Sequence, residues 1–293
     1  MIADFARKLE NIINFIPPIP AVIVELIRAL DDENSNMGTI ARVIAKDPPM
    51  SMNVLKVANS AFYRLANKVS TVDHAVKMLG VKEISMICVS CGAYQALKPP
   101  RDAGTFNLQE FWKHSVATGV IARTLCKELS VGDRQTIYFG GLLHDIGKVV
   151  LDRFAHDVYK IVMQITHDEC IAMIEAEKKI LGESHDVIGG LIMDKWKFPF
   201  VLADIARFHH NVSASSEQSR PSVALCALAD ELARLQFYGF GGNKGGVILE
   251  ETQAFRILAG IAPGINNIDM YKLVQDLETL RDEIGEMEKI LTG

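Results

Sequence analysis

Residues 136–154 read TIYFGGLLHDIGKVVLDRF, and this stretch shows the pattern that decides the fold class. Apolar residues recur at the three- and four-residue spacing of an α-helix, interrupted by the pair His144 and Asp145. The same period runs through FWKHSVATGVIARTLCKEL at 111–129 and SVALCALADELARLQFY at 222–238. We expect each of these segments to be one long helix. Because no segment alternates apolar and polar residues as a strand does, the sequence predicts an all-α fold, a multi-helix bundle.

Prolines and glycines divide the chain. FIPPIP at 15–20 opens a group of short helices, and KPPRDAGTF at 98–106 is the first internal boundary. YGFGGNKGGV at 238–247 is typical of a flexible connector; it is no P-loop, because Lys244 is followed by glycine. The sequence therefore predicts an N-terminal helical lobe at 1–100, a second helical lobe at 106–237 and a helical tail at 247–293.

Two details of this organisation can be tested. In the first lobe, Pro48 and Pro49 indicate a break, after which Met52, Leu55 and Ala58 resume the helical period. Gly80 is expected to end a helix. In the tail, a helix over 269–291 is expected to carry one apolar stripe of Leu273, Leu277, Leu280 and Ile284. That stripe predicts packing on the body of the protein or on a second copy, as a homodimer.

The composition excludes several classes of protein. Of the 293 residues, 49% are hydrophobic and 23% charged, as in a soluble protein with a core, and the net charge of −5 comes with no basic run. Nucleic acid is therefore not an expected partner. No apolar run approaches the ~18 residues of a membrane-spanning helix. Five cysteines without a secretory signal indicate reduced thiols in a cytoplasmic protein, and the CxxC of Cys88 and Cys91 is typical of small buried helix residues.

One of the eight histidines, His144, lies beside Asp145 in LLHDIGK at 142–148. Adjacent helical residues diverge by about 100°, so His144 and Asp145 flank one point only if it lies at the edge of the helix. A metal ion there would satisfy that geometry. An isolated pair of this kind is more often a helix-end histidine beside a solvated aspartate. Here Leu142, Leu143 and Ile146 surround the pair, so both polar groups need partners.

Asp230 lies on a largely apolar helical face, so it is expected to be paired, protonated or bound to a metal. Arg234, one turn later, is the alternative partner. His114 could be a core histidine bonded to the backbone, and His185 could be a solvated helix-start residue. The pair His209 and His210 ends an apolar helix, where the helix dipole favours a protonated imidazole. Each of these ordinary interpretations is reasonable alone, but together the histidines and aspartates indicate a site.

The order of these residues resembles that of the HD superfamily of metal-dependent phosphohydrolases. The ligands of that superfamily are a histidine, the HD pair and a distal aspartate on separate helices, with further histidines for a second metal. The resemblance implies a first metal position with His114, His144, Asp145 and Asp230. It implies that His185, His209 and His210 complete a second position. The expected cofactor is one or two divalent ions, of iron, manganese, zinc, nickel or cobalt.

The sequence of the first lobe narrows this resemblance to one family. IPPIPAVIVEL at 16–26, DPPMSMNVLKVANSAFY at 47–63 and DHAVKMLG at 73–80 resemble the HDOD family, over roughly residues 8–235. That family implies a proline-opened helical lobe before an HD-like lobe in bacterial signalling proteins without established general catalysis. NVSASSEQSRP at 211–221 lacks the glycine–tyrosine–proline motif of cyclic-di-GMP phosphodiesterases, so that activity is not expected.

Two functions remain open at this point. The first is a regulatory module that binds a signalling protein or a small phosphorylated ligand. The alternative is a metal-dependent phosphohydrolase acting on a nucleotide or phosphodiester. In the alternative, Asp145 and Lys148 are the catalytic candidates, with Lys148 binding a phosphate oxygen. A solvated helix-end lysine is the ordinary interpretation of Lys148.

Overall fold

Helices are the only regular elements in the described part of the chain, where no strand occurs. The structure, a computed structural model, describes residues 16, 18–32, 34–60, 62–97, 107–236, 238, 239, 247–268, 272, 275 and 278–292. The predicted all-α fold is confirmed. The predicted boundary at 98–106 and most of the connector at 238–247 lie outside the described residues. None of the described helices combines the length and the apolar composition that crossing a bilayer requires.

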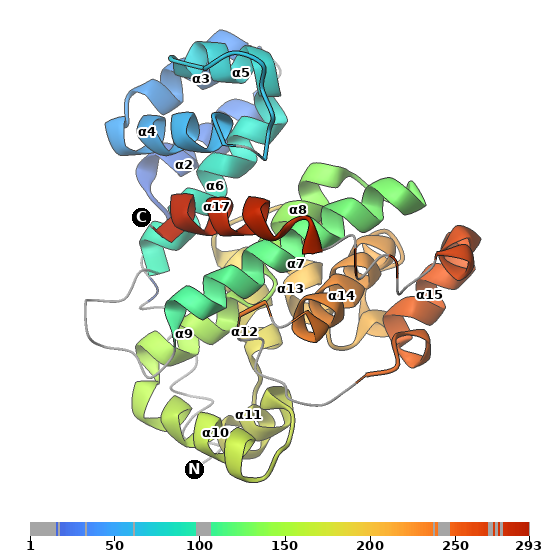
Figure 1. The fold of residues 1–293 in the computed structure, drawn as a ribbon. Coiled ribbons are helices and arrows are strands. Elements are labelled where there is room, and N and C mark those ends of the chain that lie inside the picture. Colours follow the sequence, from blue (N-terminus) through green and yellow to red (C-terminus); the bar gives the residue numbers. More distant parts are fainter. Residues whose placement is uncertain are drawn as a thin grey trace. The chain divides into compact units, whose positions relative to one another are not determined.

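The chain divides into two compact units, which are described separately (Figure 1). The N-terminal unit comprises Pro17–Lys98 and Arg281–Gly293, and the histidine unit comprises Met1–Ile16 and Pro99–Leu280. The helices of the N-terminal unit are α2 (Ala21–Asp31), α3 (Met37–Ala45), α4 (Pro48–Ala58), α5 (Val72–Leu79), α6 (Val81–Leu97) and α17 (Arg281–Thr292).

Local sequence explains where these short helices begin and end. The side chains of Asn36, Asp47 and Thr71 each accept a hydrogen bond from the backbone amide three residues later, which caps α3, α4 and α5. A cap of this kind satisfies an amide that the helix itself leaves unpaired. Gly80, at φ +85°, ends α5 as predicted. Cys88 and Cys91 are buried on α6, as their small apolar neighbours indicate.

The predicted break is confirmed, because α3 ends at Ala45 and a new helix follows. Pro48 and Pro49 form the first turn of α4, where a missing amide costs little. The predicted helical period through Met52, Leu55 and Ala58 is confirmed, but Met52 is 59% exposed and does not face the core. The residues that α4 buries are Met50, Val54, Val57 and Ala58. This helix has two apolar stripes, and the period alone does not decide which one faces the core.

The tail also differs from the prediction. Thr279 and Leu280 form a turn before α17, so the single helix expected over 269–291 is interrupted there. Leu273 and Leu277 lie outside the described residues. α17 packs on α4 of the same chain, with Ile284 and Met287 buried, and the Ser60 hydroxyl donates to the Met287 sulfur over 3.7 Å. The end of the tail is therefore part of the N-terminal unit.

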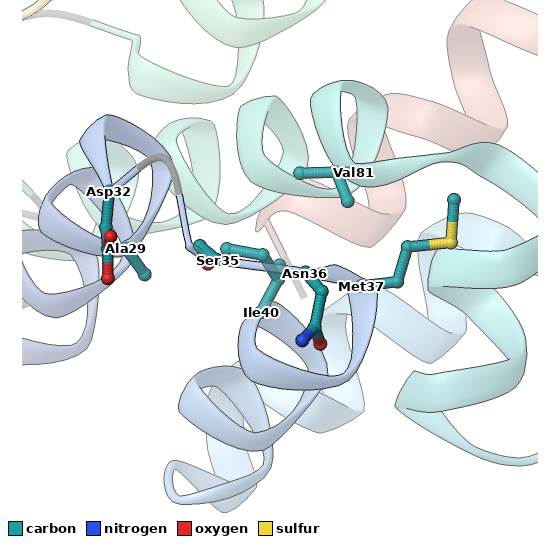
Figure 2. Close-up of a pocket in the computed structure, with 7 residues that line it drawn as sticks. All are labelled: Ala29, Asp32, Ser35, Asn36, Met37, Ile40 and Val81. Carbon is teal, nitrogen blue, oxygen red and sulfur yellow. The ribbon is translucent and has the colours of Figure 1, made fainter.

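A hollow of about 360 Å³ opens on the N-terminal unit, between the end of α2 and the start of α3 (Figure 2). It is lined by Ala29, Asp32, Ser35, Asn36, Met37, Ile40 and Val81. Asp32 is the one ionisable side chain among these lining residues. The lining therefore offers neither a set of metal ligands nor a pair of groups for acid–base chemistry.

The histidine unit is built from longer helices, with short 3₁₀ helices (η) between some of them. The elements are α7 (Leu108–Leu129), α8 (Arg134–Leu143), α9 (Ile146–Phe154), α10 (His156–Asp168), α11 (Met173–Leu181), α12 (His185–Lys195), α13 (Phe200–Phe208), η1 (Val212–Ala214), α14 (Arg220–Leu235), η2 (Leu249–Glu251), α15 (Gln253–Ile261) and η3 (Pro263–Asn267). α7 packs against α8 and α14, and α12 packs against α13 and α9 (Figure 1).

The histidine–aspartate pair lies between two helices. The single helix expected over 136–154 is wrong at this point, because α8 ends at Leu143, His144 and Asp145 form a turn, and α9 starts at Ile146. A turn resolves the difficulty that adjacent helical side chains diverge. Both side chains can therefore face the same point from one short segment.

Gly147 sets the distance between α9 and α12. A Cβ atom at Gly147 would lie 1.9 Å from the backbone oxygen of His185 and 2.9 Å from the backbone nitrogen of Gly189. Neither position can be vacated by rotating a side chain. Only glycine therefore allows the turn that carries Asp145 to approach the helix that carries His185.

We predict that Gly147→Ala lowers the free energy of unfolding by roughly 3 kcal/mol, because the backbones of α9 and α12 must separate. Gly260→Ala is the matched control: Gly260 lies on α15 with no described atom within 4 Å of its added Cβ. There alanine is expected to be neutral or to stabilise the helix by up to about 1 kcal/mol. Urea unfolding of both variants tests this, and equal stabilities would contradict the packing argument.

Candidate metal centre

The carboxylate of Asp145 lies at the centre of a cluster of histidines and is 1% exposed. Its Oδ2 atom lies 3.2 Å from Nε2 of His144 and 4.0 Å from Nε2 of His114. Its Oδ1 atom lies 3.1 Å from Nε2 of His185 and 3.5 Å from Nε2 of His209. The two oxygens of one carboxylate thus face two different groups of imidazoles.

Asp230 completes the first group. It projects from α14, and its Oδ1 atom lies 2.9 Å from Nε2 of His114 on α7 and 3.7 Å from Nε2 of His144. Arg234, the alternative partner considered from the sequence, instead pairs with Glu231. The first group therefore consists of the imidazoles of His114 and His144, which lie between the carboxylates of Asp230 and Asp145. We call this the first position.

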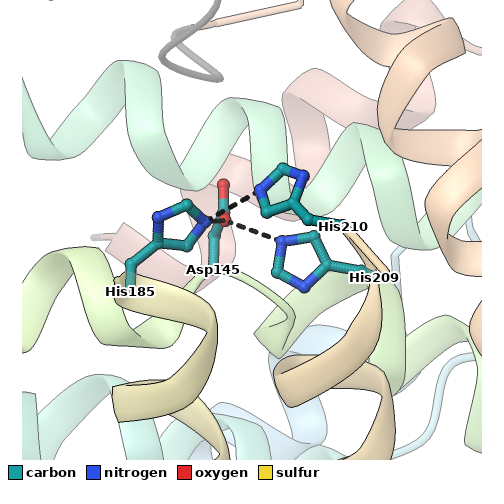
Figure 3. Close-up of side chains that lie close together, drawn as sticks. All are labelled: Asp145, His185, His209 and His210. Atoms are coloured by element: carbon teal, nitrogen blue, oxygen red, sulfur yellow. Dashed lines mark hydrogen bonds and ion pairs between the residues drawn. The ribbon is translucent and has the colours of Figure 1, made fainter. Parts of the chain in front are cut away.

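Three histidines form the second group around Oδ1 of Asp145 (Figure 3). His185 is the first residue of α12, and His209 and His210 directly follow α13. Nε2 of His185 lies 3.0 Å from Nε2 of His210. Suitable ligand atoms of Asp145 and these three histidines lie within 4.8 Å of one another. We call this the second position. His210 is its one partly exposed member.

Hydrogen bonds at the far side of each ring determine which nitrogen faces the cluster. Nδ1 of His114 lies 3.2 Å from the backbone oxygen of Tyr238, and Nδ1 of His144 lies 2.7 Å from that of Gly141. Nδ1 of His209 lies 2.9 Å from the backbone oxygen of Ala206. Because a carbonyl oxygen only accepts, each Nδ1 carries the proton. In the neutral ring, Nε2 then carries the lone pair that faces the cluster, as a metal ligand requires.

Several of the atoms that face the cluster make no hydrogen bond to any described residue. They are Nε2 of His114, His144 and His209, and Oδ1 of Asp145 and Asp230. Leaving a buried polar atom unpaired costs about 1–3 kcal/mol, so five that converge at one place need an explanation. Imidazole and carboxylate are ligands that divalent iron, manganese, zinc, nickel and cobalt accept. The residues present therefore fit a divalent metal.

The same charges shift the pKa values within the cluster. Burial alone would raise the pKa of Asp145, but His144 and Lys148 outweigh it and hold that pKa well below its usual range. Burial would lower the pKa of His144, yet the carboxylates of Asp145 and Asp230 raise it to about 10. Burial lowers the pKa of His209 and, further, of His210. Carboxylates stay ionised here, and a cation at the first position competes with a proton on His144.

Lys148 is buried, so the interpretation as a solvated helix-end lysine is wrong. Its side chain is 2% exposed, and its ammonium nitrogen lies 2.5 Å from Oδ2 of Asp145. This is the oxygen that faces the first position. The positive charge nearest to the central carboxylate is thus a residue of α9, one turn after Asp145.

Sequence reasoning missed Glu177 on α11. It is fully buried, and its Oε2 atom lies 2.5 Å from Nδ1 of His185. A signal was present in the sequence, because Glu177 lies four residues after Met173 and four before Leu181, both buried. An acid on the apolar face of a helix needs a partner, which is the argument that identified Asp230.

The sequence of this chain is similar to that of known proteins. The model of the HDOD domain family matches residues 16–212. A protein of Treponema pallidum without a characterised function is 25% identical over 232 residues, which is 78% of this chain and 44% of that protein. The chain thus spans less than half the length of this relative.

Solved structures share the fold. An HDOD domain protein of unknown function from Geobacter sulfurreducens is 24% identical, with a TM-score of 0.83 over 99% of this chain and 98% of that one. A candidate phosphohydrolase from Shewanella amazonensis is also 24% identical, with a TM-score of 0.75 over 97% and 98%. A candidate signal transduction protein from Marinobacter aquaeolei is 20% identical, with a TM-score of 0.76 over 99% and 66%.

We predict that Asp145→Ala abolishes divalent metal binding at both positions, because Asp145 supplies an oxygen to each. It should also destabilise the metal-free protein by about 3–5 kcal/mol, since buried positive groups lose their nearest carboxylate. Asp145→Asn keeps the shape and should lose metal with a smaller loss of stability. The measurements are elemental analysis and urea unfolding.

His167→Ala is the control for this prediction. His167 lies on α10 of the same unit, and its side chain is 70% exposed beside Asp168. Its loss should change neither metal content nor stability. If Asp145→Ala retained as much metal as His167→Ala, the cluster would not be a metal site.

Proposed function

The chain belongs to the HDOD domain family, and we propose that it is a signal-transduction module whose histidine–aspartate cluster holds one or two divalent cations. The observation that carries the proposal is the convergence of five buried nitrogen and oxygen atoms that make no hydrogen bond to a described residue. A cation would satisfy these atoms together. In its absence, compensation falls to ion pairs such as that of Asp230 with His114 and to a proton on His144.

The ligands of the two positions differ. The first position would use imidazole nitrogens of His114 and His144 and oxygens of Asp145 and Asp230. The second would use the other oxygen of Asp145 with the imidazoles of His185, His209 and His210. Asp145 is shared, so the occupancy of one position affects the other. The nitrogen-rich second position suits softer ions better than the first does.

A regulatory role is supported by where the ligands come from. They lie on α7, the turn before α9, the start of α12, the end of α13, and α14. A cation that binds only the folded arrangement stabilises the packing of all five segments. Metal occupancy would therefore change how firmly the histidine unit holds together. We infer that the binding of a signalling protein or a small phosphorylated ligand depends on this change. The name of the Marinobacter relative agrees with such a role.

The alternative function is a metal-dependent phosphohydrolase acting on a nucleotide or phosphodiester. One observation favours it: a single carboxylate has its two oxygens directed at two ligand groups, as in two-metal hydrolases. Divalent cations supply Lewis-acid activation of phosphate esters when bound. In this chain Asp145 would hold both ions. Lys148, beside Asp145, would neutralise charge on a phosphate oxygen.

Measurements of metal content, hydrogen exchange and hydrolysis on one preparation distinguish these functions. Protein purified without chelator is expected to contain one to two equivalents of divalent metal per chain. Removing the metal is expected to increase amide hydrogen exchange in α7, α12 and α14, because these helices supply ligands. The regulatory function predicts that hydrolysis of bis(p-nitrophenyl) phosphate, nucleotides and cyclic dinucleotides does not exceed that of Asp145→Ala.

Two other results would contradict the regulatory function. Metal-dependent hydrolysis of any of these compounds, lost in both Asp145→Ala and Lys148→Met, would establish the phosphohydrolase. Protein that contains no divalent metal and takes up none from solution would contradict both functions.

A further inference from the structure

Glu177 occupies an unusual place for a carboxylate. It lies at the middle of α11, is fully buried, and contacts the cluster through His185. Its Oε2 atom accepts two hydrogen bonds from that residue, one from the backbone amide over 2.9 Å and one from Nδ1 over 2.5 Å. The backbone bond also caps the first turn of α12, which His185 begins.

The other oxygen of Glu177 is held as well. The hydroxyl of Tyr159, on α10, donates to Oε1 over 3.2 Å, and Tyr159 is itself buried. α10 and α11 pack against each other, so the tyrosine and the glutamate come from one helical hairpin. With donors on both oxygens, the carboxylate has one orientation. The carboxylate therefore fixes the plane of the His185 ring.

This arrangement singles out His185 among the histidines of the cluster. His114, His144 and His209 place Nδ1 against neutral backbone carbonyls. His185 places Nδ1 against a full negative charge. A carboxylate on the far nitrogen sets the tautomer and makes the near nitrogen a stronger donor to a cation. The strongest imidazole donor thus lies at the second position.

We propose that Glu177 is the positioning residue of the second metal position, where it holds His185 with Nδ1 protonated and Nε2 directed at Oδ1 of Asp145. This inference rests on the proposed metal-binding function. It assigns to the α10–α11 hairpin a part in metal binding although neither helix supplies a ligand. It also means that the supports differ: His114 and His144 of the first position rest on backbone carbonyls alone, whereas the second position has a buried carboxylate behind His185 besides the carbonyl behind His209.

The test is Glu177→Gln. The amide oxygen of glutamine can still accept both bonds from His185, so the fold and the cap of α12 are retained while the charge is removed. Chelator-treated protein is titrated with Co²⁺, followed by visible absorption and by the metal retained after desalting. We expect the wild type to bind two ions. The variant should bind the first normally and the second at least about tenfold more weakly.

Two further variants and the unfolding temperature complete the experiment. Glu175→Gln makes the same change on the exposed side of α11 and should titrate as the wild type does. Glu177→Ala, which removes both bonds, should weaken the second ion further and also lower the unfolding temperature. A lower unfolding temperature of Glu177→Gln with unchanged Co²⁺ affinities would show a purely structural role and overturn the proposal.

The remaining outcomes separate this inference from the function on which it rests. If the wild type binds Co²⁺ and Glu177→Gln binds it with the same number and affinity, only the positioning role is wrong. If the wild type binds a single ion and Glu177→Gln weakens it, the role stands for a mononuclear site. If the wild type binds no Co²⁺ and no other divalent metal, the metal site and the positioning role both fail.

Discussion

Burial of the Asp145 carboxylate is the constraint on which the histidine unit depends. An ionised carboxylate that is 1% exposed must have positive or hydrogen-bond-donating neighbours on every side. Here Lys148 pairs with it from one turn away, while imidazoles such as those of His114 and His185 come to it from distant parts of the chain. The helices that carry these neighbours can approach only where their side chains are small, as at Gly147. The charge of Asp145 therefore needs partners at the same place where the backbones of α9 and α12 pack closely.

The residues of the cluster could be singled out from the sequence because several of them are polar exceptions among apolar neighbours. His114 and Asp230 are polar residues on apolar faces, and the order of the set resembles that of a known superfamily. Glu177 met the same criterion but was overlooked, because α11 also carries several solvated charges. The direction of each ring could not be predicted. It depends on carbonyls such as those of Gly141 and Tyr238, which no side-chain pattern reveals.

The fold class followed from periodicity, whereas helix ends and phases did not. The turn at His144 interrupts a stretch whose apolar period is continuous, because the tertiary requirement to face one point outweighs local preference. α4 has two apolar stripes, and only packing selects the one that includes Met50. The turn at Thr279 likewise divides a segment with a regular stripe. Periodicity reports which residues can be helical, and tertiary contacts decide where each helix stops.

The hydrogen bond between His114 and the backbone of Tyr238 spans 124 positions of the chain. During synthesis, the first ligand leaves the ribosome long before the residue that sets its tautomer exists. A nascent chain without α14 also lacks Asp230, so it has histidines but no complete first position. The complete first position, with the geometry described above, can therefore form only late in synthesis, after α14 has been made.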